Sequence, residues 1–301
     1  MNDVICQGPK LQRDIFYVLL RFRRFPVALV CGIAEMYLTI GISPLSRPFH
    51  RFSWRDVDQS RPPAVYQFNS LVFGVNSCPY QAQFVSKKRA RENQEHYPRV
   101  AETILESTYM DDSMDSSPSE EEYVKLYEEL SALWGSAGMH ARKWLSNSDH
   151  VLKRVPEEDR AAEVDLDKGN LPSMKTLGVL WLAKEDVFTY RVNPPDEKFQ
   201  LTKRNFLRKI AMLFDPMGFL APYVIRAKIL LQEMWTSGLD RDDPLDPSQA
   251  RQAKKWFEEL AELSDVQVPR CLQLNSHVET VRYLAHFHRC IRGCVWCSNL
   301  R

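Results

Sequence analysis

The sequence lacks several features that would place the protein in a broad class. Its longest apolar run, residues 27–38, is interrupted by Glu35 and is too short to cross a bilayer. No early apolar stretch is followed by a small-residue cleavage site, so we expect no secretory signal. Neither sign of charge dominates, because 40 Lys and Arg face 39 Asp and Glu, which excludes a uniformly basic protein of the histone type. The seven cysteines are an odd number in a long chain, which favours reduced thiols in an intracellular, cytoplasmic or nuclear, protein.

The size and composition predict about two folded domains. The chain has 301 residues, of which 44% are hydrophobic and 26% are charged, as in ordinary globular proteins. The charge is distributed unevenly. Residues 1–110 contain 14 Lys or Arg against 9 Asp or Glu, whereas residues 111–130 contain 1 Lys against 8 acids. Nucleic-acid binding therefore depends on local patches and is not excluded by the net charge.

Hydrophobic periodicity predicts an α/β mixture up to about residue 195 and a helical region after it. Helical spacing and capping residues predict helices at 10–24 and 78–95, after Pro98, after Ser119, after Thr202, at 220–235 and after Ser248. Short runs of β-formers predict strands at 27–31, 49–54, 65–73, 177–182, 187–192 and 266–268. Arg21, Arg23 and Arg24 at the end of the first helix favour either phosphate contacts or the negative end of the helix dipole.

One hairpin concentrates acidic residues. Residues 108–115 read as two short β segments with Asp111 and Asp112 at the tip. Two adjacent carboxylates repel each other unless a cation neutralises them, and Mg²⁺ takes such ligands together with substrate phosphates. Two such ions can activate a 3′-hydroxyl and stabilise a leaving pyrophosphate. An Asp-Asp pair in an ordinary surface turn is the alternative.

The context of this pair resembles one enzyme family. Tyr109-Met110-Asp111-Asp112 is the signature of reverse transcriptases, and the chain resembles the polymerase region of Pao/BEL-type long-terminal-repeat retrotransposons over roughly residues 2–270. The collinear segments that carry the resemblance are 2–4, 8–9, 18–23, 26–40, 50–56, 73–79, 142–147, 177–181, 203–210, 213–222 and 226–232.

The resemblance implies a fold and a set of domains. The fold is α+β: a right-hand polymerase palm with an antiparallel sheet and partial fingers over 1–195, followed by a helical thumb- or connection-like region over 196–264. Residues 265–301 are a divergent tail where a ribonuclease H domain would begin. His286, His288, Cys290, Cys294 and Cys297 in this tail are candidate zinc ligands, but a second pair at finger spacing is missing. The sequence has no Asp-Thr-Gly or Asp-Ser-Gly turn, so we expect no aspartic peptidase.

The resemblance also implies roles for individual residues. Asp111 and Asp112 would bind Mg²⁺, with Mn²⁺ as the alternative ion, and Lys143 would give a proton to the pyrophosphate. The residues implied to contact the template–primer and the incoming deoxynucleotide are Tyr37, Phe73, Gly74, Tyr109 and Met110. Tyr37 would block a ribose 2′-hydroxyl, unless it is a core aromatic. Gly74 would lie beneath the nucleotide, unless it only forms an ordinary bend, and Lys143 could equally be a solvated side chain.

At one position the sequence departs from the family pattern. The first palm motif should present an aspartate after the buried strand, but the aligned residue is Gly32. Glycine has no side chain to bind a metal, and Glu35 points elsewhere if the segment turns helical. We therefore expect a retrotransposon fragment whose RNA-directed DNA polymerase activity is impaired. A non-catalytic module that binds nucleic acid or protein is the alternative function.

Overall fold

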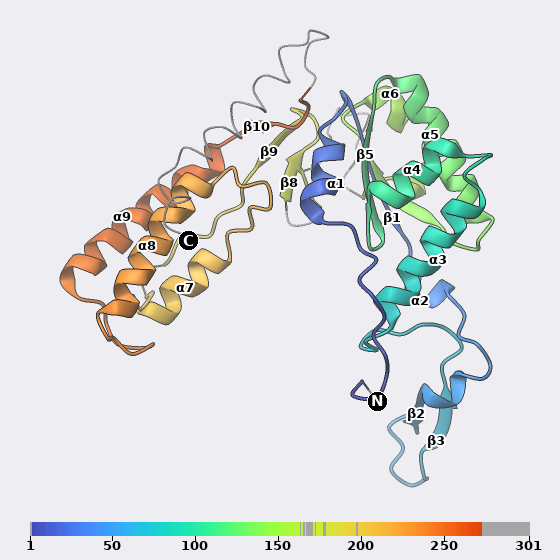
Figure 1. Ribbon diagram of the computed structural model, residues 1–301, viewed down its shortest axis with the longest axis horizontal. Coiled ribbons are helices and arrows are strands. Elements are labelled where there is room, and N and C mark those ends of the chain that lie inside the picture. The colour runs from blue at the N-terminus through green and yellow to red at the C-terminus, as the bar shows by residue number, and fades with distance from the viewer. Residues whose placement is uncertain are drawn as a thin grey trace, which may run out of the picture.

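A four-stranded antiparallel sheet forms the centre of the larger lobe. The computed structural model describes residues 2–272 except 163, 165, 167–170, 172, 177, 178 and 197, and except the side chains of 173–176. The strand order is β4-β5-β1-β6. The strands are β1 (Val27–Ile33), β4 (Thr108–Tyr109), β5 (Asp112–Ser117) and β6 (Ala141–Leu145). Figure 1 shows this lobe and a separate helical lobe side by side.

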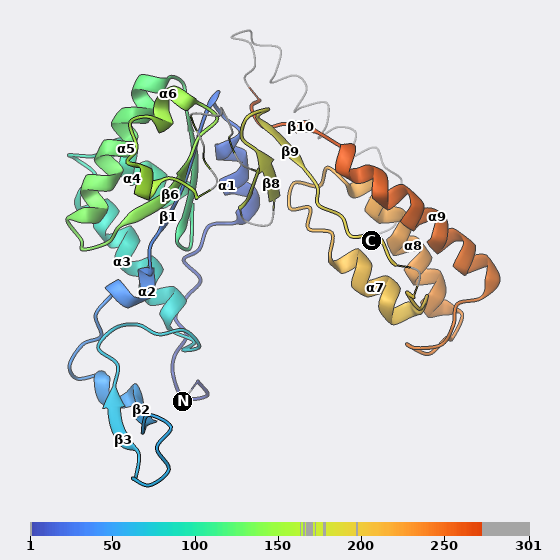
Figure 2. The ribbon, with the colours of Figure 1, turned by 180° about the vertical axis from the view of Figure 1, so that it is seen from behind.

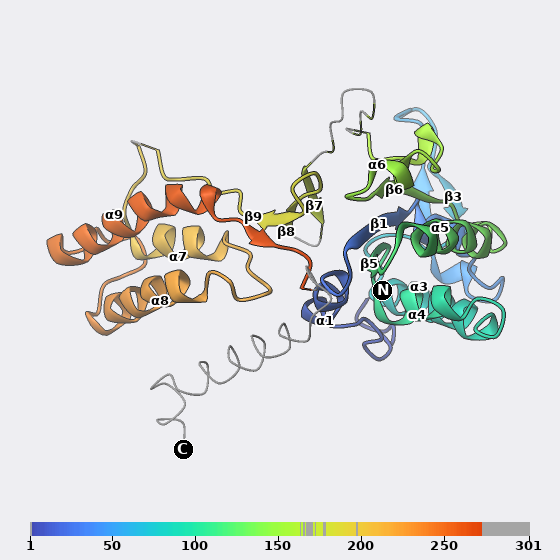
Figure 3. The ribbon, with the colours of Figure 1, turned by 90° about the horizontal axis from the view of Figure 1, so that it is seen from above.

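The central sheet is covered on both faces. Alternate residues of β1 point to opposite sides, so Leu29 and Cys31 join one core and Ala28 and Val30 the other. The helices of this lobe are α1 (Ile15–Phe22), α2 (Met36–Thr39), α3 (Cys78–Glu92), α4 (Pro98–Glu106), α5 (Glu120–Gly135) and α6 (Asp149–Leu152). Helices α3, α4 and α5 lie on one side and α1 on the other (Figure 3). Burial on both faces explains why β1 is almost continuously apolar.

The helical lobe consists of α7 (Lys203–Ala211), α8 (Ala221–Thr236) and α9 (Pro247–Glu262). These helices pack around Phe206, Trp256 and Phe257, whose rings meet edge to face at centroid distances of 5.3–5.6 Å. A second sheet of order β10-β9-β8-β7 lies between the lobes (Figure 2). Its strands are β7 (Ser173–Thr176), β8 (Val179–Leu182), β9 (Val187–Thr189) and β10 (Val268–Pro269).

Arg270 connects the two lobes. Its side chain is fully buried, and the guanidinium donates to the carbonyls of Phe22, Phe25 and Pro26 at 2.5–2.8 Å. The same group donates twice to the Asp186 carboxylate, at 2.5 and 2.8 Å. A buried cation is tolerated only when it is paired and hydrogen-bonded, as this one is. The chain beyond the helical lobe therefore returns to brace the end of α1.

The arginines at the end of α1 have structural partners. Arg23 donates to the backbone oxygens of Pro269 and Arg270, and burial together with the positive charge of Arg270 lowers its pKa to about 10. Arg21 donates to Ser107 Oγ and forms an ion pair with Glu102. These contacts hold the lobe together, so neither arginine is free for a phosphate.

Several sequence predictions are confirmed and a few boundaries are corrected. Ser119 and Thr202 cap α5 and α7 as expected, by accepting hydrogen bonds from backbone N–H groups three residues on. The first helix begins at Ile15, after the Asp14 cap, and α9 is capped by Asp246 instead of Ser248. Strand β6 was not expected. The strand expected at 65–73 is shorter and lies in a separate ribbon of β2 (Arg51–Trp54) and β3 (Ala64–Gln67).

Three short 3-10 turns complete the described structure: η1 (Arg47–Phe49), η2 (Glu157–Asp159) and η3 (Leu263–Asp265). None of the helices in the described part of the chain has the length and apolar character needed to cross a membrane. The candidate zinc ligands of the tail, His286, His288, Cys290, Cys294 and Cys297, lie outside the described residues.

Candidate functional site

The acidic hairpin forms, but its tip lies one residue earlier than predicted, at Met110 and Asp111 instead of Asp111 and Asp112. Strands β4 and β5 pair through Tyr109 and Asp112, so Met110 and Asp111 form a two-residue loop. Met110 has φ 58°, whereas Asp111 is not among the residues of positive φ, which is the pattern of a type II′ turn. The carbonyl of Met110 accepts a hydrogen bond from Gln83 Nε2 of α3 at 3.0 Å. The loop is therefore held from the side by a helix that the sequence analysis did not connect to it.

The two carboxylates of the hairpin are in unequal environments. Asp111 is exposed at the tip, whereas Asp112 is half-buried at the start of β5. Burial and the negative charge of Asp111 raise the pKa of Asp112 to about 6, and the ammonium of Lys143 lowers it. The pair thus retains a repulsion that one lysine relieves only in part, and a bound cation would relieve the rest.

Gly32 lies directly beside this pair. It is the Cα partner of Asp112 in the β1–β5 ladder, and the next residue, Ile33, donates its N–H to the Asp111 carbonyl at 2.9 Å. A Cβ atom added at position 32 would lie 3.1 Å from Asp112 Oδ1 and 3.9 Å from the Asp111 carbonyl oxygen. A carboxylate at this position would therefore lie beside the Asp112 carboxylate and the backbone carbonyl of Asp111.

The side chains present supply fewer acidic ligands than a two-metal site needs. Within the described residues, no group of three or more His, Cys, Asp or Glu side chains lies close enough to hold a metal ion. Glu35 does not complete such a group. It is exposed, has φ 49° and precedes α2, where its carbonyl accepts from Leu38 and Thr39. The donor set therefore fits a pair of shared metal ions only if a further carboxylate is added.

Lys143 reaches the site through a β-bulge. The β1–β6 register shifts between Val30 and Gly32, so that β6 contains one residue more than β1 over this stretch. Lys143 lies in the bulge with φ 58°. Its side chain is exposed, and its charge acts on Asp112. A non-glycine residue with a left-handed backbone conformation is uncommon. Here this conformation belongs to a bulge at the edge of the candidate site.

An aromatic pair borders the hairpin on the α2 side. The rings of Tyr37 and Phe73 lie 5.0 Å apart between centroids, with an angle of 54° between their planes. Tyr37 is half-buried, and burial, Cys78 and Asp111 together raise the pKa of its hydroxyl. Phe73 is 78% exposed. Gly74 follows with φ 87°, so the bend requires glycine for its backbone conformation.

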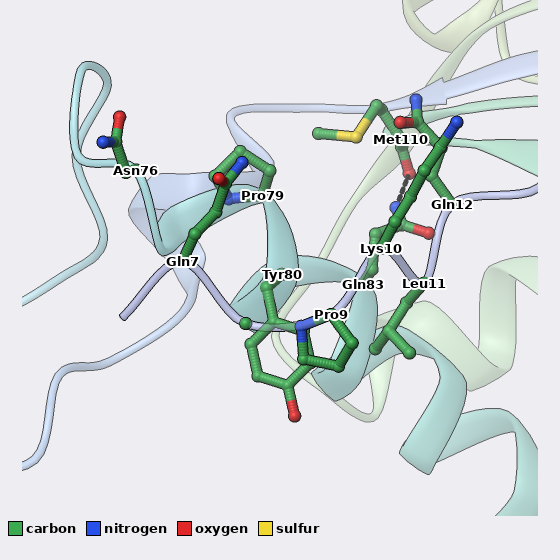
Figure 4. A pocket seen from close by; sticks show the side chains of 11 residues that line it. Gln7, Pro9, Lys10, Leu11, Gln12, Asn76, Pro79, Tyr80, Gln83 and Met110 are labelled. Carbon is green, nitrogen blue, oxygen red and sulfur yellow. Dashed lines mark hydrogen bonds between the residues drawn. The ribbon is translucent and has the colours of Figure 1, made fainter. Parts of the chain in front are cut away.

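The first residues of the chain line a cavity next to Met110. The cavity has a volume of about 320 Å³ and lies between residues 7–12 and the start of α3, where Tyr80 and Gln83 face it (Figure 4). Gly8 packs so closely on the Tyr80 ring that an added Cβ would lie 2.5 Å from it. Asn2 donates to the Gly74 carbonyl at 2.7 Å and accepts from the Asn76 N–H at 3.1 Å. Residues 2–4 and 8–9 carry part of the family resemblance, but no site role was predicted for them.

The structure therefore brings most of the expected site residues into one neighbourhood. Asp111, Asp112, Tyr109 and Met110 form the hairpin, Gly32 lies beside it on β1, and Lys143 acts on it from β6. Tyr37 and Phe73 pack together, and the charge of Asp111 acts on Tyr37. Gln83 and the N-terminal segment were missed, because their proximity depends on how α3 crosses the hairpin.

Comparison with known proteins gives one match. Residues 202–288 match the family model described as the Pao retrotransposon-like RNaseH-like domain. The described part of this range consists of α7, α8, α9, η3 and β10, so the match covers the helical lobe and not the acidic hairpin. A search of curated proteins found no match. The family-model match supports a Pao retrotransposon-type protein.

Proposed function

We propose that this chain is a reverse-transcriptase-like fragment of a Pao/BEL-type element. Its ancestral activity is RNA-directed DNA synthesis, and the present chain retains binding of template–primer and deoxynucleotide with little catalysis. Two features support the proposal: the segments that resemble the polymerase region, and an antiparallel sheet that presents two adjacent aspartates on a hairpin. The two-domain interpretation, a palm over 1–195 and a thumb- or connection-like region over 196–264, is part of the same proposal.

One observation carries the proposed loss of activity. Position 32 faces Asp112 so closely that its Cβ would lie 3.1 Å from the carboxylate, yet it holds glycine. A pair of metal ions would need several carboxylate ligands, and without a side chain at position 32 only Asp111 and Asp112 would supply them. With only two carboxylates in place, we assign no catalytic step through Mg²⁺ or Mn²⁺. Asp111 and Asp112 would hold a divalent ion weakly, and Lys143 would place an ammonium beside the leaving phosphates.

The aromatic pair is the proposed contact surface for the nucleotide base and sugar. Tyr37 and Phe73 form an aromatic platform of two tilted rings, and the charge of Asp111 acts on Tyr37. Gly74 leaves open space beside Phe73, since a Cβ added there would meet no atom within 4 Å. A nucleotide base and sugar resting on this platform would bring its phosphates toward the hairpin. Met110 and Tyr109 would border the same space from the hairpin side.

The test is primer extension with an oligo(dT)-primed poly(rA) template in Mg²⁺ and, separately, in Mn²⁺. The parent chain, Gly32→Asp and the uncharged control Gly32→Asn are compared at equal concentration. We expect extension by Gly32→Asp to exceed that of the other two by at least roughly 100-fold, the scale of losing one group that stabilises transition-state charge. Adding Asp111→Asn to Gly32→Asp should abolish the gain.

Two results would contradict the proposal. Extension by the parent chain at the rate of Gly32→Asp would show that position 32 is not needed for catalysis. A Gly32→Asp variant that binds template–primer and remains inactive would show that the glycine is not what disables the site.

A further inference from the structure

The β2–β3 ribbon is the most exposed secondary structure of the larger lobe. Strands β2 and β3 pair antiparallel from Arg51 with Gln67 to Trp54 with Ala64, and all eight residues are exposed. The ribbon projects away from the central sheet, at the lower end of the lobe in Figure 1. Isolated two-stranded ribbons are only marginally stable in water. The exposed aromatic side chains on this ribbon therefore call for an explanation.

Four aromatic side chains share one face of this ribbon. Phe52 and Trp54 are two residues apart on β2, Tyr66 lies opposite Phe52, and Phe68 follows two residues later. Three of the rings form a row, with centroids 5.6 Å apart between Phe52 and Tyr66 and 4.7 Å apart between Phe52 and Phe68. Trp54 extends the same face of β2, and its indole N–H donates to the Asp56 carboxylate at 2.5 Å. Each ring is between 37% and 51% exposed. A contiguous exposed aromatic row of this kind marks a binding surface more often than a free one.

The charge around the row is positive. Residues 47–68 contain four arginines and one histidine against two aspartates. Both aspartates, Asp56 and Asp58, form ion pairs with Arg61. Within the described part of the chain, no acid pairs with Arg51 or Arg55. Arg51 lies on the face of β2 opposite to Phe52, whereas Arg55 directly follows Trp54 at the end of the strand. Arg55 is therefore the cation nearest the aromatic face that is available to a polyanion.

The base of the ribbon is tied to the candidate site. Gly41 and Ser70 form a β-bridge, the Ile42 N–H donates to the Asn69 carbonyl at 2.7 Å, and the Leu71 N–H donates to the Ile40 carbonyl at 2.9 Å. Tyr37 precedes this tie and Phe73 follows it. Residues 41–70, which include the ribbon, therefore leave the larger lobe shortly after Tyr37 and return to it shortly before Phe73.

We propose that the aromatic face of the β2–β3 ribbon, formed by Phe52, Trp54, Tyr66 and Phe68, binds single-stranded nucleic acid by base stacking. Aromatic rows beside cations bind single strands with little sequence preference, because every base has a π face and every nucleotide a phosphate. A strand held on this face would be close in the chain to the Tyr37–Phe73 platform. The proposal concerns binding only and holds whether or not the hairpin supports synthesis.

The test is fluorescence anisotropy of the full chain with dye-labelled 20-nucleotide oligo(U) and oligo(dT). The variant Phe52→Ala/Tyr66→Ala is compared with Val65→Ala, which removes an exposed apolar side chain from the opposite face of the same ribbon. We expect the double variant to bind at least about fivefold more weakly, the change that corresponds to one lost stacked base, and Val65→Ala to bind like the parent. Arg55→Gln should reduce the salt dependence of binding by roughly 0.7 in log K against log salt, whereas Arg51→Gln, on the face of Val65, should leave it unchanged.

Because the substituted rings are exposed, the variants should unfold at the same urea concentration as the parent, which separates binding from folding. Equal oligonucleotide affinity of parent and double variant would overturn the proposal. So would a preference for duplex that is unaffected by both ring substitutions. Loss of a protein contact with unchanged oligonucleotide affinity would assign the face to a protein partner and overturn it as well. None of these results depends on primer extension, so the proposed polymerase ancestry is tested separately.

Discussion

Strand β5 is polar but buried, whereas the β2–β3 ribbon is rich in aromatic residues but exposed. Strand β5 reads Asp-Ser-Met-Asp-Ser-Ser, and its last five residues are buried. The ribbon carries Phe52, Trp54 and Tyr66 and is exposed throughout. Both are antiparallel pairs in the same lobe, so the pairing itself does not decide burial. What differs is the cover: β5 lies between α4 and α1, whereas the aromatic face of the ribbon has no such cover among the described elements.

Burial of β5 is possible because its polar groups have partners. Asp115 Oδ2 accepts from Thr103 Oγ1 at 2.7 Å and lies 3.0 Å from the Arg99 guanidinium. Ser116 Oγ donates to the Arg21 carbonyl and accepts from the Phe25 N–H. A buried polar group costs little when it is hydrogen-bonded and several kcal/mol when it is not. The hydrogen bonds thus allow a strand that hydropathy alone would place on the surface.

The largest difference in stability between the two regions is expected when one tryptophan is removed from each. Trp144 of β6 is fully buried and packs edge to face on Tyr127 at 4.8 Å, whereas Trp54 of β2 is 51% exposed. Trp144→Ala should lower the free energy of unfolding by about 4 kcal/mol, through lost burial and the cavity left behind. Trp54→Ala should change it by less than about 0.5 kcal/mol. Urea denaturation measures both, and comparable losses would contradict the exposed position of the ribbon.

A smaller effect is expected from the acids of the two regions. Asp115→Ala removes the carboxylate that accepts from the buried Thr103 hydroxyl and pairs with Arg99, and should lower the free energy of unfolding by about 2–3 kcal/mol, because a buried hydrogen bond and an ion pair are lost together. Asp58→Ala on the ribbon should leave it unchanged within error, since its ion pair with Arg61 is solvent-exposed. Equal effects in thermal or urea unfolding would show that the β5 contacts contribute nothing beyond surface pairing.

The third prediction concerns Asp112, which is half-buried and thus intermediate between the buried Asp115 and the exposed Asp58. Asp112 has a pKa of about 6 when folded, against 3.8 ordinarily, so the folded chain keeps its proton where the unfolded chain has lost it. Stability from this group is therefore present below about pH 4 and is lost as the pH rises toward 6. Asp112→Asn should be more stable than the parent by roughly 2 kcal/mol above pH 6, after allowance for partial exposure, and equal to it below pH 4. Urea unfolding between pH 3.5 and 8 checks this.

The control for the third prediction is Asp111→Asn. It removes one neighbouring charge but not the burial of Asp112, which is the larger cause of the raised pKa. We therefore expect a smaller gain over the same pH range. A gain for Asp112→Asn that does not change with pH would contradict the raised pKa.

The local elements were largely readable from the sequence. The acidic hairpin follows from β-formers around Asp111 and Asp112, and the caps Ser119 and Thr202 follow from their side-chain chemistry. Hairpin-forming and helix-capping residues act on residues nearby in the chain, so they can be recognised from the sequence alone. The Gly32 position was also found by aligning motifs, and the register beside Asp112 agrees with it.

Other features depend on contacts between distant segments and left no local signal. Strand β6 contains Arg142 and Lys143 and was not expected, because only its pairing with β1 makes it a strand. Gln83 reaches Met110 through the crossing of α3 over the hairpin. The ribbon strands were expected, but their exposure was not, since aromatic residues usually mark a core. The polymerase roles of Asp111, Asp112, Lys143, Tyr37, Phe73 and Gly74 stay predictions.

Arg270 has a consequence for how such a chain can be divided. The family-model match begins at residue 202 and runs past Arg270, yet the carbonyls and the carboxylate that hold this guanidinium belong to residues 22–26 and 186. A cut near residue 200 would separate a buried cation from every one of these acceptors and expose the end of α1 to water. The part that matches the family and the part that carries the hairpin therefore depend on each other for folding: division between them would yield two incomplete folding units, not two modules.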